Sequence, residues 1–374
     1  MAQKQRETTK RKTKTQTAKN GTVKSKTTKT GTATKRNTKK ATTQPRKKAV
    51  QTKKNKKALR HKKRRNPNKL FLCVLVELIV LAILAGIIGW NHGLEDFLWD
   101  MSRPVVKDLD LSGIQSSQAV LMQARGGKVI GKIGEEERIY PASMTKMMTV
   151  VVALEKLKDT NQRIRLDAEI FEKLYGMDAT QAGFQPGEEV RVIDLLYGAM
   201  LPSGAECCLA LAYEIGGSEE GFAELMNRKA EKIGMQETHF CNATGLHEEG
   251  HYSTVKDLAL LLKYALRNET FREIAESRFH STGVTNIHPD GITYYSTLFK
   301  KLSDPAVTGG QILGGKTGYT DEAGLCLASY AEIEGREYIL VTAGAFGSST
   351  DVWHIQDALT IYHRLGIAAQ ELSR

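Results

Sequence analysis

The sequence predicts an α+β fold, in which helices flank one antiparallel sheet and a large helical insertion separates its strands. Three observations lead to this prediction. Residues 119–134 are typical of two short strands around a turn at Gly126 and Gly127. The middle section, about 165–280, has apolar residues mostly at helical spacing. Strand patterns then return at 309–319, 324–333 and 337–346, and the turn EGRE joins the last two.

Helices are expected before, within and after that middle section. The first runs from about Ser143 to Leu157, and the last covers 351–366. The middle section itself contains four, at 192–201, 206–216, 221–234 and 254–268. We find no internal repeat, so the pattern indicates a single domain over residues 118–374.

The charge is distributed very unevenly along the chain. The net charge of +12 combines a basic segment, residues 1–69, with an acidic body. That segment holds 27 Lys and Arg and a single acid, Glu7, whereas the remainder holds 27 basic and 41 acidic residues. Because it has almost no apolar residues to bury, we expect a disordered tail. Such a tail is attracted to anionic lipid headgroups, with nucleic acid as the alternative partner.

A membrane anchor is expected directly after the tail. Residues 70–90, LFLCVLVELIVLAILAGIIGW, contain one ionisable side chain, Glu77, and are long enough as a helix to cross a bilayer core of about 30 Å. The preceding Lys and Arg predict a cytoplasmic N-terminus, with everything after the span outside the cell. The long basic segment favours an uncleaved signal anchor over a cleaved signal peptide. Residues 91–117 are interpreted as a juxtamembrane connector.

Cysteine and histidine spacing gives no indication of a metal or cofactor. The four cysteines of the body are expected to be buried free thiols, because each lies among apolar neighbours: Cys207, Cys208, Cys241 and Cys326. His247 and His251 are four residues apart, but the rest of a metal motif is missing. We therefore expect no metal and no cofactor.

A serine and a lysine occupy the start of the first expected helix. In PASMTKMMT, Ser143 and Lys146 are three residues apart, so they share one helix face and the ammonium can reach the hydroxyl. Pro141 also places the backbone N–H of Ser143 among the unsatisfied donors of a helix N-terminus. A serine near a helix start is also ordinary capping chemistry, so this pair alone does not establish a catalytic site.

Two later motifs change that interpretation. LLYGAMLPSGAECC places Ser203 on a turn between two apolar helices, and GGKTGYTDEAG carries Lys316, Thr317 and Gly318 at the end of a strand pattern. In this order the three elements resemble the S-x-x-K, S-x-N and K-T-G motifs of the penicillin-binding and serine β-lactamase superfamily. Longer stretches, among them QPGEEVRVIDLLYGAMLPSG and NATGLHEEGHYSTVKDLALL, are similar to serine-type D-alanyl-D-alanine carboxypeptidases. The resemblance spans about 119–366 and implies a penicillin-binding/β-lactamase-like fold.

The resemblance implies a catalytic role for three residues. Ser143 would attack the carbonyl of the penultimate D-alanine and form an acyl-enzyme. Lys146 would take its proton, which requires burial or a nearby positive charge to destabilise the ammonium. Ser203 would relay a proton to the departing amine.

The resemblance also implies that the third motif, Lys316-Thr317-Gly318, binds the substrate. Lys316 would attract an anionic substrate, and Thr317 would hold its terminal carboxylate. Next to Gly318, the backbone N–H of Tyr319 would form an oxyanion hole together with that of Ser143. β-Lactam antibiotics would acylate the same serine as covalent inhibitors.

The second motif departs from the family pattern. It reads Ser203-Gly204-Ala205, so the usual Asn is replaced by a methyl group. A neighbour such as Glu206 or a water would have to compensate, or turnover would be weakened. In the extreme case the protein would be a non-catalytic cell-wall binding or scaffold protein.

A serine β-lactamase is a further alternative. That activity needs a base for fast deacylation, and Glu248 and Glu249 lie in the appropriate interval. We interpret them as part of a solvated loop, because the segment resembles the carboxypeptidases. The expected function is therefore a membrane-anchored carboxypeptidase that trims the pentapeptide stems of peptidoglycan.

Overall fold

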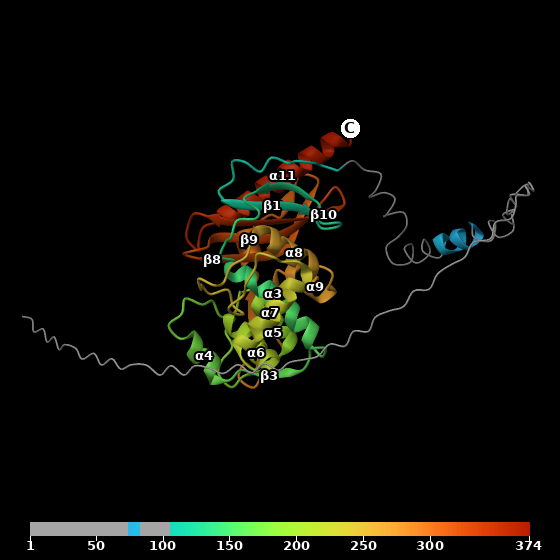
Figure 1. Cartoon of the computed structure of the whole chain (residues 1–374). Helices are drawn as coiled ribbons and strands as arrows, with labels where there is room; N and C mark the ends of the chain where they lie inside the picture. The colour runs from blue at the N-terminus through green and yellow to red at the C-terminus, as the bar shows by residue number, and fades with distance from the viewer. Residues whose placement is uncertain (1–73, 83–104) are drawn as a thin grey trace, which may run out of the picture. The chain divides into compact units, whose positions relative to one another are not determined.

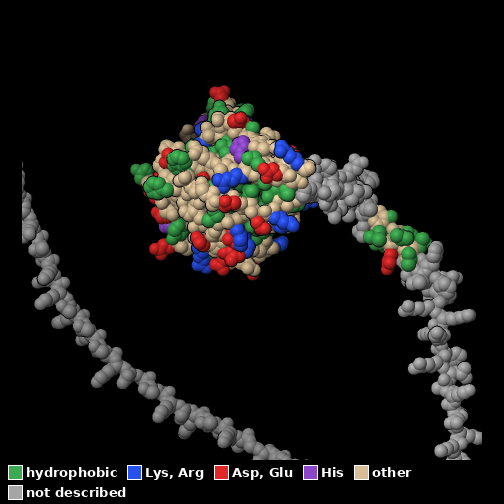
Figure 2. Space-filling model, turned by 90° about the horizontal axis from the view of Figure 1, so that it is seen from above, with side chains coloured by type: hydrophobic (Ala, Val, Ile, Leu, Met, Phe, Trp, Pro, Cys, Tyr) green, Lys and Arg blue, Asp and Glu red, His purple; other side chains and the backbone are tan. Residues whose placement is uncertain are grey.

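A computed structural model describes residues 74–82 and 105–374 (Figure 1). The expected tail, most of the expected span and residues 91–104 of the connector lie outside the described residues. Residues 74–82 form a helix that contains one acidic residue, Glu77. Its apolar side chains are exposed (Figure 2). None of the helices within the described ranges combines the length and hydropathy that a bilayer crossing needs.

The sheet is antiparallel, as predicted. Within residues 105–374 its strand order is β2-β1-β10-β9-β8-β7, so the first hairpin pairs with the last strand of the domain. The strands are β1 (Gln118–Gln123), β2 (Val129–Ile133), β7 (Ala306–Val307), β8 (Gly310–Thr320), β9 (Gly324–Ile333) and β10 (Arg336–Ala345). The expected strand patterns at 309–319, 324–333 and 337–346 correspond to β8, β9 and β10.

The helical insertion separates β2 from β7. It contains a 3-10 turn, η1 (Ala142–Thr145), and the helices α3 (Lys146–Lys156), α4 (Ala168–Leu174), α5 (Val192–Met200), α6 (Ala205–Gly216), α7 (Glu219–Ile233), α8 (Val255–Ala265), α9 (Glu269–Glu276) and α10 (Thr297–Lys301). The last helix is α11 (Trp353–Leu372), which is six residues longer at its C-terminal end than the 351–366 prediction.

The sheet is covered on both faces. Helix α11 lies on one face, and the insertion, with α8 and α9 in contact with the strands, lies on the other (Figure 1). Alternate residues of β10 enter the two cores: Ile339 and Val341 face the insertion, whereas Tyr338 and Leu340 face α11. This alternation explains why the strands look almost continuously apolar in sequence.

Two structural features differ from the sequence expectation. Residues 105–117 were expected to be a connector, yet Val106 and Leu111 are buried in the α11 core. The Asp357 carboxylate accepts hydrogen bonds from the backbone of Gln115 and Ser116, so the domain begins before residue 118. The middle section, expected to be mostly helical, also contains two small antiparallel ribbons: β3 (Arg163–Arg165) with β4 (Glu189–Arg191), and β5 (Phe279–Ser281) with β6 (Thr293–Tyr295).

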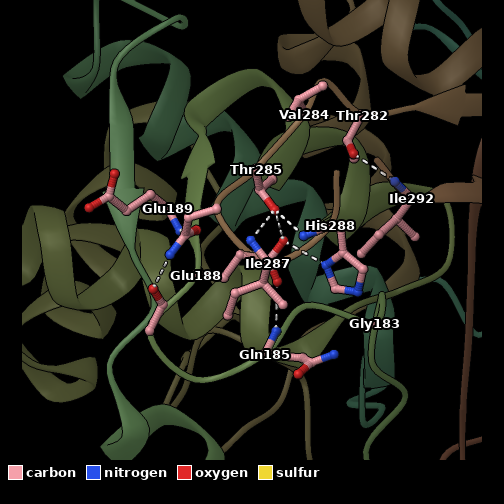
Figure 3. A network of polar contacts seen from close by, with 12 residues as sticks. Gly183, Gln185, Glu188, Glu189, Thr282, Val284, Thr285, Ile287, His288 and Ile292 are labelled. Atoms are coloured by element: carbon pink, nitrogen blue, oxygen red, sulfur yellow. Dashed lines mark hydrogen bonds and ion pairs between the residues drawn. The ribbon is translucent and has the colours of Figure 1, made fainter. Parts of the chain in front are cut away.

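The buried carboxylate of Glu188 links the loop of the β5–β6 ribbon to the segment that precedes β4 (Figure 3). Glu188 is fully buried, and its Oε1 accepts hydrogen bonds from Thr285 Oγ1 at 2.6 Å and His288 Nδ1 at 2.8 Å. Its Oε2 accepts the backbone N–H of Gln185 at 2.9 Å. The loop between β5 and β6 is thereby held against the segment that leads from α4 to β4.

Candidate active site

The expected serine–lysine pair is brought together at the start of α3. Ser143 lies on η1 rather than on the α-helix itself, and Lys146 is the first residue of α3. The Nζ of Lys146 is 2.8 Å from the Oγ of Ser143. The second partner of Nζ is the backbone carbonyl of Thr244, at 2.6 Å. Lys146 is almost completely buried, and this burial lowers its pKa from the ordinary lysine value.

A second buried lysine holds the other predicted serine. Ser203 lies on the turn between α5 and α6 with φ of +70°, a backbone conformation that costs a non-glycine residue about 1–3 kcal/mol. Its Oγ accepts a hydrogen bond of 3.0 Å from Lys316 Nζ, which also donates to the Thr317 carbonyl. Burial lowers the pKa of Lys316 far below its usual range, and the nearby positive charge of Lys146 lowers it further.

Strand β8 lies directly against the nucleophile segment. A Cβ on Gly318 would lie only 3.2 Å from the backbone N of Ser143 and from the Cβ of Ala142. A glycine at this position therefore permits the close approach of β8 to Ser143. The Thr317 hydroxyl is within 2.7 Å of the Thr297 hydroxyl on α10, which orients it. The third motif thus lies beside the first, as the resemblance implies.

The missing Asn is not replaced by Glu206. Ala205 is buried at the start of α6, and Glu206 directs its Oε1 to the backbone N–H groups of Ala182 and Gly183, at 2.6 and 2.9 Å. Its Oε2 has no hydrogen-bond partner within the described residues, and burial raises the pKa of the carboxyl. Glu206 therefore anchors the segment around Ala182, whereas the Thr244 carbonyl holds Lys146.

The loop that supplies this carbonyl is fastened at several points. The Asn242 side chain accepts hydrogen bonds from the backbone N–H groups of Thr244 and Gly245, at 3.2 and 2.8 Å. The Thr149 hydroxyl of α3 donates to the Ala243 carbonyl at 2.6 Å. Gly245 has φ of +79°, and a Cβ there would lie 1.9 Å from the carbonyl oxygen of Ala142. The loop therefore packs tightly against the nucleophile segment.

His251 makes a further buried attachment. Its Nδ1 accepts the backbone N–H of Cys241 at 3.1 Å, so Nε2 carries the proton and donates to Thr145 Oγ1 at 2.8 Å. Burial lowers the pKa of His251 to about 4, and the charges of His239, His247 and Lys146 act in the same direction. Both ring nitrogens are engaged with protein groups, which leaves neither for the metal pairing with His247 considered from the spacing.

The sequence analysis missed Thr244 and Thr297, and it considered His251 only as a metal ligand. Thr244 acts through a backbone carbonyl, which no residue type specifies, although the Asn-x-x-Gly pattern at 242–245 is typical of a tight turn. The described cysteines are free thiols as expected, but Cys241 is only partly buried, because its loop lies at the surface.

Comparisons with known proteins support the resemblance to D-alanyl-D-alanine carboxypeptidases over most of the domain. The family model Peptidase_S11, D-alanyl-D-alanine carboxypeptidase, matches residues 105–347. The D-alanyl-D-alanine carboxypeptidase DacF of Bacillus subtilis is 34% identical over 242 residues, which cover 62% of this chain and 58% of DacF. DacC of Escherichia coli is 32% identical, over 60% of this chain and 56% of DacC. The chain thus spans less than two thirds of these relatives.

Solved structures support the fold. The crystal structure of the Streptomyces K15 DD-transpeptidase is similar with a TM-score of 0.60 and 27% identity, and the match covers 68% of this chain and 98% of that one. A D-alanyl-D-alanine carboxypeptidase from Mycobacterium tuberculosis has a TM-score of 0.58 at 23% identity, a likeness of fold. The architecture is therefore the expected penicillin-binding-like α+β fold, and the chain belongs to the Peptidase_S11 family of D-alanyl-D-alanine carboxypeptidases.

Proposed function

We propose that this protein removes the terminal D-alanine from peptidoglycan stem peptides through an acyl-enzyme on Ser143. The observation that carries the proposal is the 2.8 Å contact between Ser143 Oγ and the buried Nζ of Lys146. A lysine whose pKa is lowered by burial can lose its proton closer to neutral pH. The contact can then reverse, so that the serine hydroxyl donates to the lone pair of the amine.

Acylation follows from this arrangement. Ser143 Oγ forms a bond to the carbonyl carbon of the penultimate D-alanine while its proton passes to Lys146. The negative charge that develops on the carbonyl oxygen is stabilised by the backbone N–H groups of Ser143 and Tyr319. When the C–N bond breaks, Ser203 delivers its proton to the departing amine and receives in exchange the proton that Lys146 took, so that Lys146 is again a neutral amine. Lys316 and Thr317 bind the carboxylate of the leaving D-alanine.

Deacylation completes the cycle. A water molecule attacks the ester of Ser143, and its proton passes to Lys146, which returns a proton to the serine oxygen. A β-lactam undergoes the same first step, because its strained amide occupies the place of the scissile bond. The chain is accordingly also a penicillin-binding protein, inhibited covalently at Ser143.

The location of the enzyme forms part of the proposal. We place residues 70–90 across the cell membrane, residues 1–69 on the cytoplasmic side and the catalytic domain outside, where its cell-wall substrate lies. The support is the apolar run of 70–90 and the block of Lys and Arg before it. The basic tail would contact anionic lipid headgroups, or nucleic acid as the alternative.

The direct test measures D-alanine release from a pentapeptide and covalent labelling by a fluorescent penicillin. Ser143→Ala is expected to abolish both, whereas Ser281→Ala, at an exposed serine on β5, should leave both unchanged. Labelling of Ser143→Ala at the wild-type level would refute the assignment of the nucleophile.

Two observations favour second candidates. The match to a DD-transpeptidase suggests acyl transfer to an amine, which would give a new peptide in the presence of an amino acceptor such as glycine. Ala205 suggests a weakened enzyme that acts as a cell-wall binding protein. That alternative predicts no D-alanine release from the wild type and no recovery with Ala205→Asn.

A further inference from the structure

Thr297, the first residue of α10, lies next to a residue that is proposed to bind the substrate carboxylate. Its Oγ1 is 2.7 Å from the Oγ1 of Thr317 on β8. Both threonines are partly exposed, so a ligand can approach them. The residue after Thr317 is Gly318, which closely approaches Ser143. The two hydroxyls are therefore only one residue along β8 from the contact with the nucleophile segment.

The surrounding structure fixes the position of Thr297. Ser296 caps α10, and Leu298 is buried in the core beneath α11. The backbone N–H of Thr297 donates to the carbonyl of Leu201 at 2.9 Å, in the turn that carries the second motif. The backbone of Thr297 is thus attached to the second motif, whereas its hydroxyl contacts Thr317 of the third.

The donors assigned so far leave part of the substrate carboxylate without a partner. Two of the three N–H groups of Lys316 donate to Ser203 Oγ at 3.0 Å and to the Thr317 carbonyl at 2.9 Å, so at most one is free. Thr317 supplies a single O–H. A carboxylate can accept about four hydrogen bonds through its two oxygens. A further donor beside Thr317 would therefore hold it more completely.

The hydroxyl of Thr297 can be this donor. In the structure, one hydroxyl of the pair donates to the other. A hydroxyl proton rotates about its C–O bond, so both protons can turn toward a ligand. Two hydrogen bonds to a charged carboxylate are stronger than one bond between neutral hydroxyls. A carboxylate that contacts Thr317 Oγ1 is also within reach of an oxygen only 2.7 Å from it.

We propose that Thr297 donates to one carboxylate oxygen of the substrate while Thr317 donates to the other. The inference rests on the proposed function and deepens it, because it adds a specificity-determining residue from outside the three motifs. The pair of hydroxyls selects peptides with a free terminal carboxylate over peptides whose terminus is a neutral amide.

The experiment compares two substrates that differ only at this terminus: Nα,Nε-diacetyl-L-Lys-D-Ala-D-Ala and the same peptide ending in D-alaninamide. Release of the last residue is measured by chromatography, and the full-length wild type should prefer the acid. Thr297→Val should lower kcat/KM for the acid about tenfold, mainly through KM, and that for the amide less than about twofold. Thr297→Ser keeps the hydroxyl and should retain most of the preference.

Thr293→Val is the matched control. The Oγ1 of Thr293 is likewise 2.7 Å from a hydroxyl, that of Ser281, on the exposed strands β5 and β6. This variant should leave the kinetics of both substrates unchanged. An equal loss for acid and amide in Thr297→Val would indicate a displaced α10 and overturn the proposal, as would a wild type without preference for the acid.

The variant Thr317→Val separates a direct contact from an effect transmitted through Thr317. If Thr297 binds the carboxylate itself, Thr297→Val should lower the preference for the acid further when it is added to Thr317→Val. No further loss would show that Thr297 only positions Thr317, and would refute the direct contact.

A binding measurement separates this inference from the proposed function. In Ser143→Ala, the Kd values of the two peptides, measured by fluorescence polarisation with a dye on the Nα group, require no turnover. A preference for the acid that Thr297→Val reduces would support the contact even if the wild type releases no D-alanine. Equal binding of acid and amide, or no binding of either, would overturn it, whatever the activity.

Discussion

Replacing His251 by Gln should make folding less sensitive to acid while keeping the site intact. The imidazole accepts from the Cys241 N–H and donates to Thr145 Oγ1. A Gln carboxamide offers an acceptor and a donor at a similar spacing, so it can make both hydrogen bonds. It cannot take up a proton, however. The substitution therefore removes the titration of a buried group and leaves its contacts in place.

The size of the effect follows from the two pKa values of the histidine. In the folded protein, burial lowers the pKa of His251 to about 4, from 6.5 in the unfolded chain. As the pH falls below 6.5, the unfolded chain binds the proton before the folded one does, so stability is lost. The contribution is fully present above pH 6.5 and decreases toward pH 4. Between pH 7.5 and pH 5 the loss is about 2 kcal/mol.

The assay is the free energy of unfolding in urea at these two pH values. Wild type should lose about 2 kcal/mol more than His251→Gln on going from pH 7.5 to pH 5. His363→Gln exchanges the same side chains at an exposed position and serves as the control. Penicillin labelling at pH 7.5 should be retained in His251→Gln, which shows that the loop is intact. The same pH dependence in wild type and His251→Gln would refute the buried, neutral histidine.

Three further predictions concern the lysine and its loop. Gly245→Ala should slow acylation by a fluorescent penicillin more than about tenfold, because its Cβ would collide with the Ala142 carbonyl. Gly176→Ala is the control, because Gly176 has a similar φ of +77° but open space around the added Cβ. It should cost about 1 kcal/mol of stability and leave the acylation rate unchanged. Equal slowing of acylation in the two variants would contradict a collision at Gly245. Ala205→Asn should change the acylation rate less than about tenfold, because the Thr244 carbonyl already holds Lys146. A hundredfold increase in the rate would show that Lys146 is poorly held in the wild type. The acylation rate should rise with pH as Lys146 loses its proton, with a midpoint below 10.5, the ordinary pKa of lysine; a midpoint at or above 10.5 would exclude a buried lysine base.

The sequence predicted those parts of the fold that long periodic patterns specify. The strands β8, β9 and β10 and the helices α5 to α8 follow from apolar spacing over nine or more residues. The ribbons β3–β4 and β5–β6 have strands of three residues, too short for a period to be recognised. Their position depends on tertiary contacts such as Glu188 with Thr285 and His288. The burial of Val106 could not be predicted either, because one apolar residue in an irregular segment carries no pattern.

The candidate site likewise has parts that the sequence predicted and parts that it could not predict. Ser143, Lys146, Ser203 and Lys316 have motifs that a sequence displays, and the structure joins them in two hydrogen-bonded pairs, Ser143 with Lys146 and Ser203 with Lys316. The group that holds Lys146 in place of the missing Asn is a carbonyl, and any residue at position 244 would supply one. Glu206, one of the alternatives considered for compensation, directs one carboxylate oxygen to the backbone of Ala182 and Gly183, and its other oxygen has no hydrogen-bond partner within the described residues.

Because a carbonyl of the loop around Thr244 holds Lys146, the position of this lysine depends on the hydrogen bonds that fix the loop. An Asn at position 205 would act from the first turn of α6, whereas the Thr244 carbonyl keeps its place through Asn242, Thr149 and His251. None of these three attachments involves Lys316 or Thr317, the residues proposed to bind the substrate carboxylate. Changes in them should therefore slow the acylation step, because they displace the proton acceptor, and leave substrate binding nearly as it was. With Ala at position 205, Lys146 is thus held by a loop carbonyl and not by a side chain of α6.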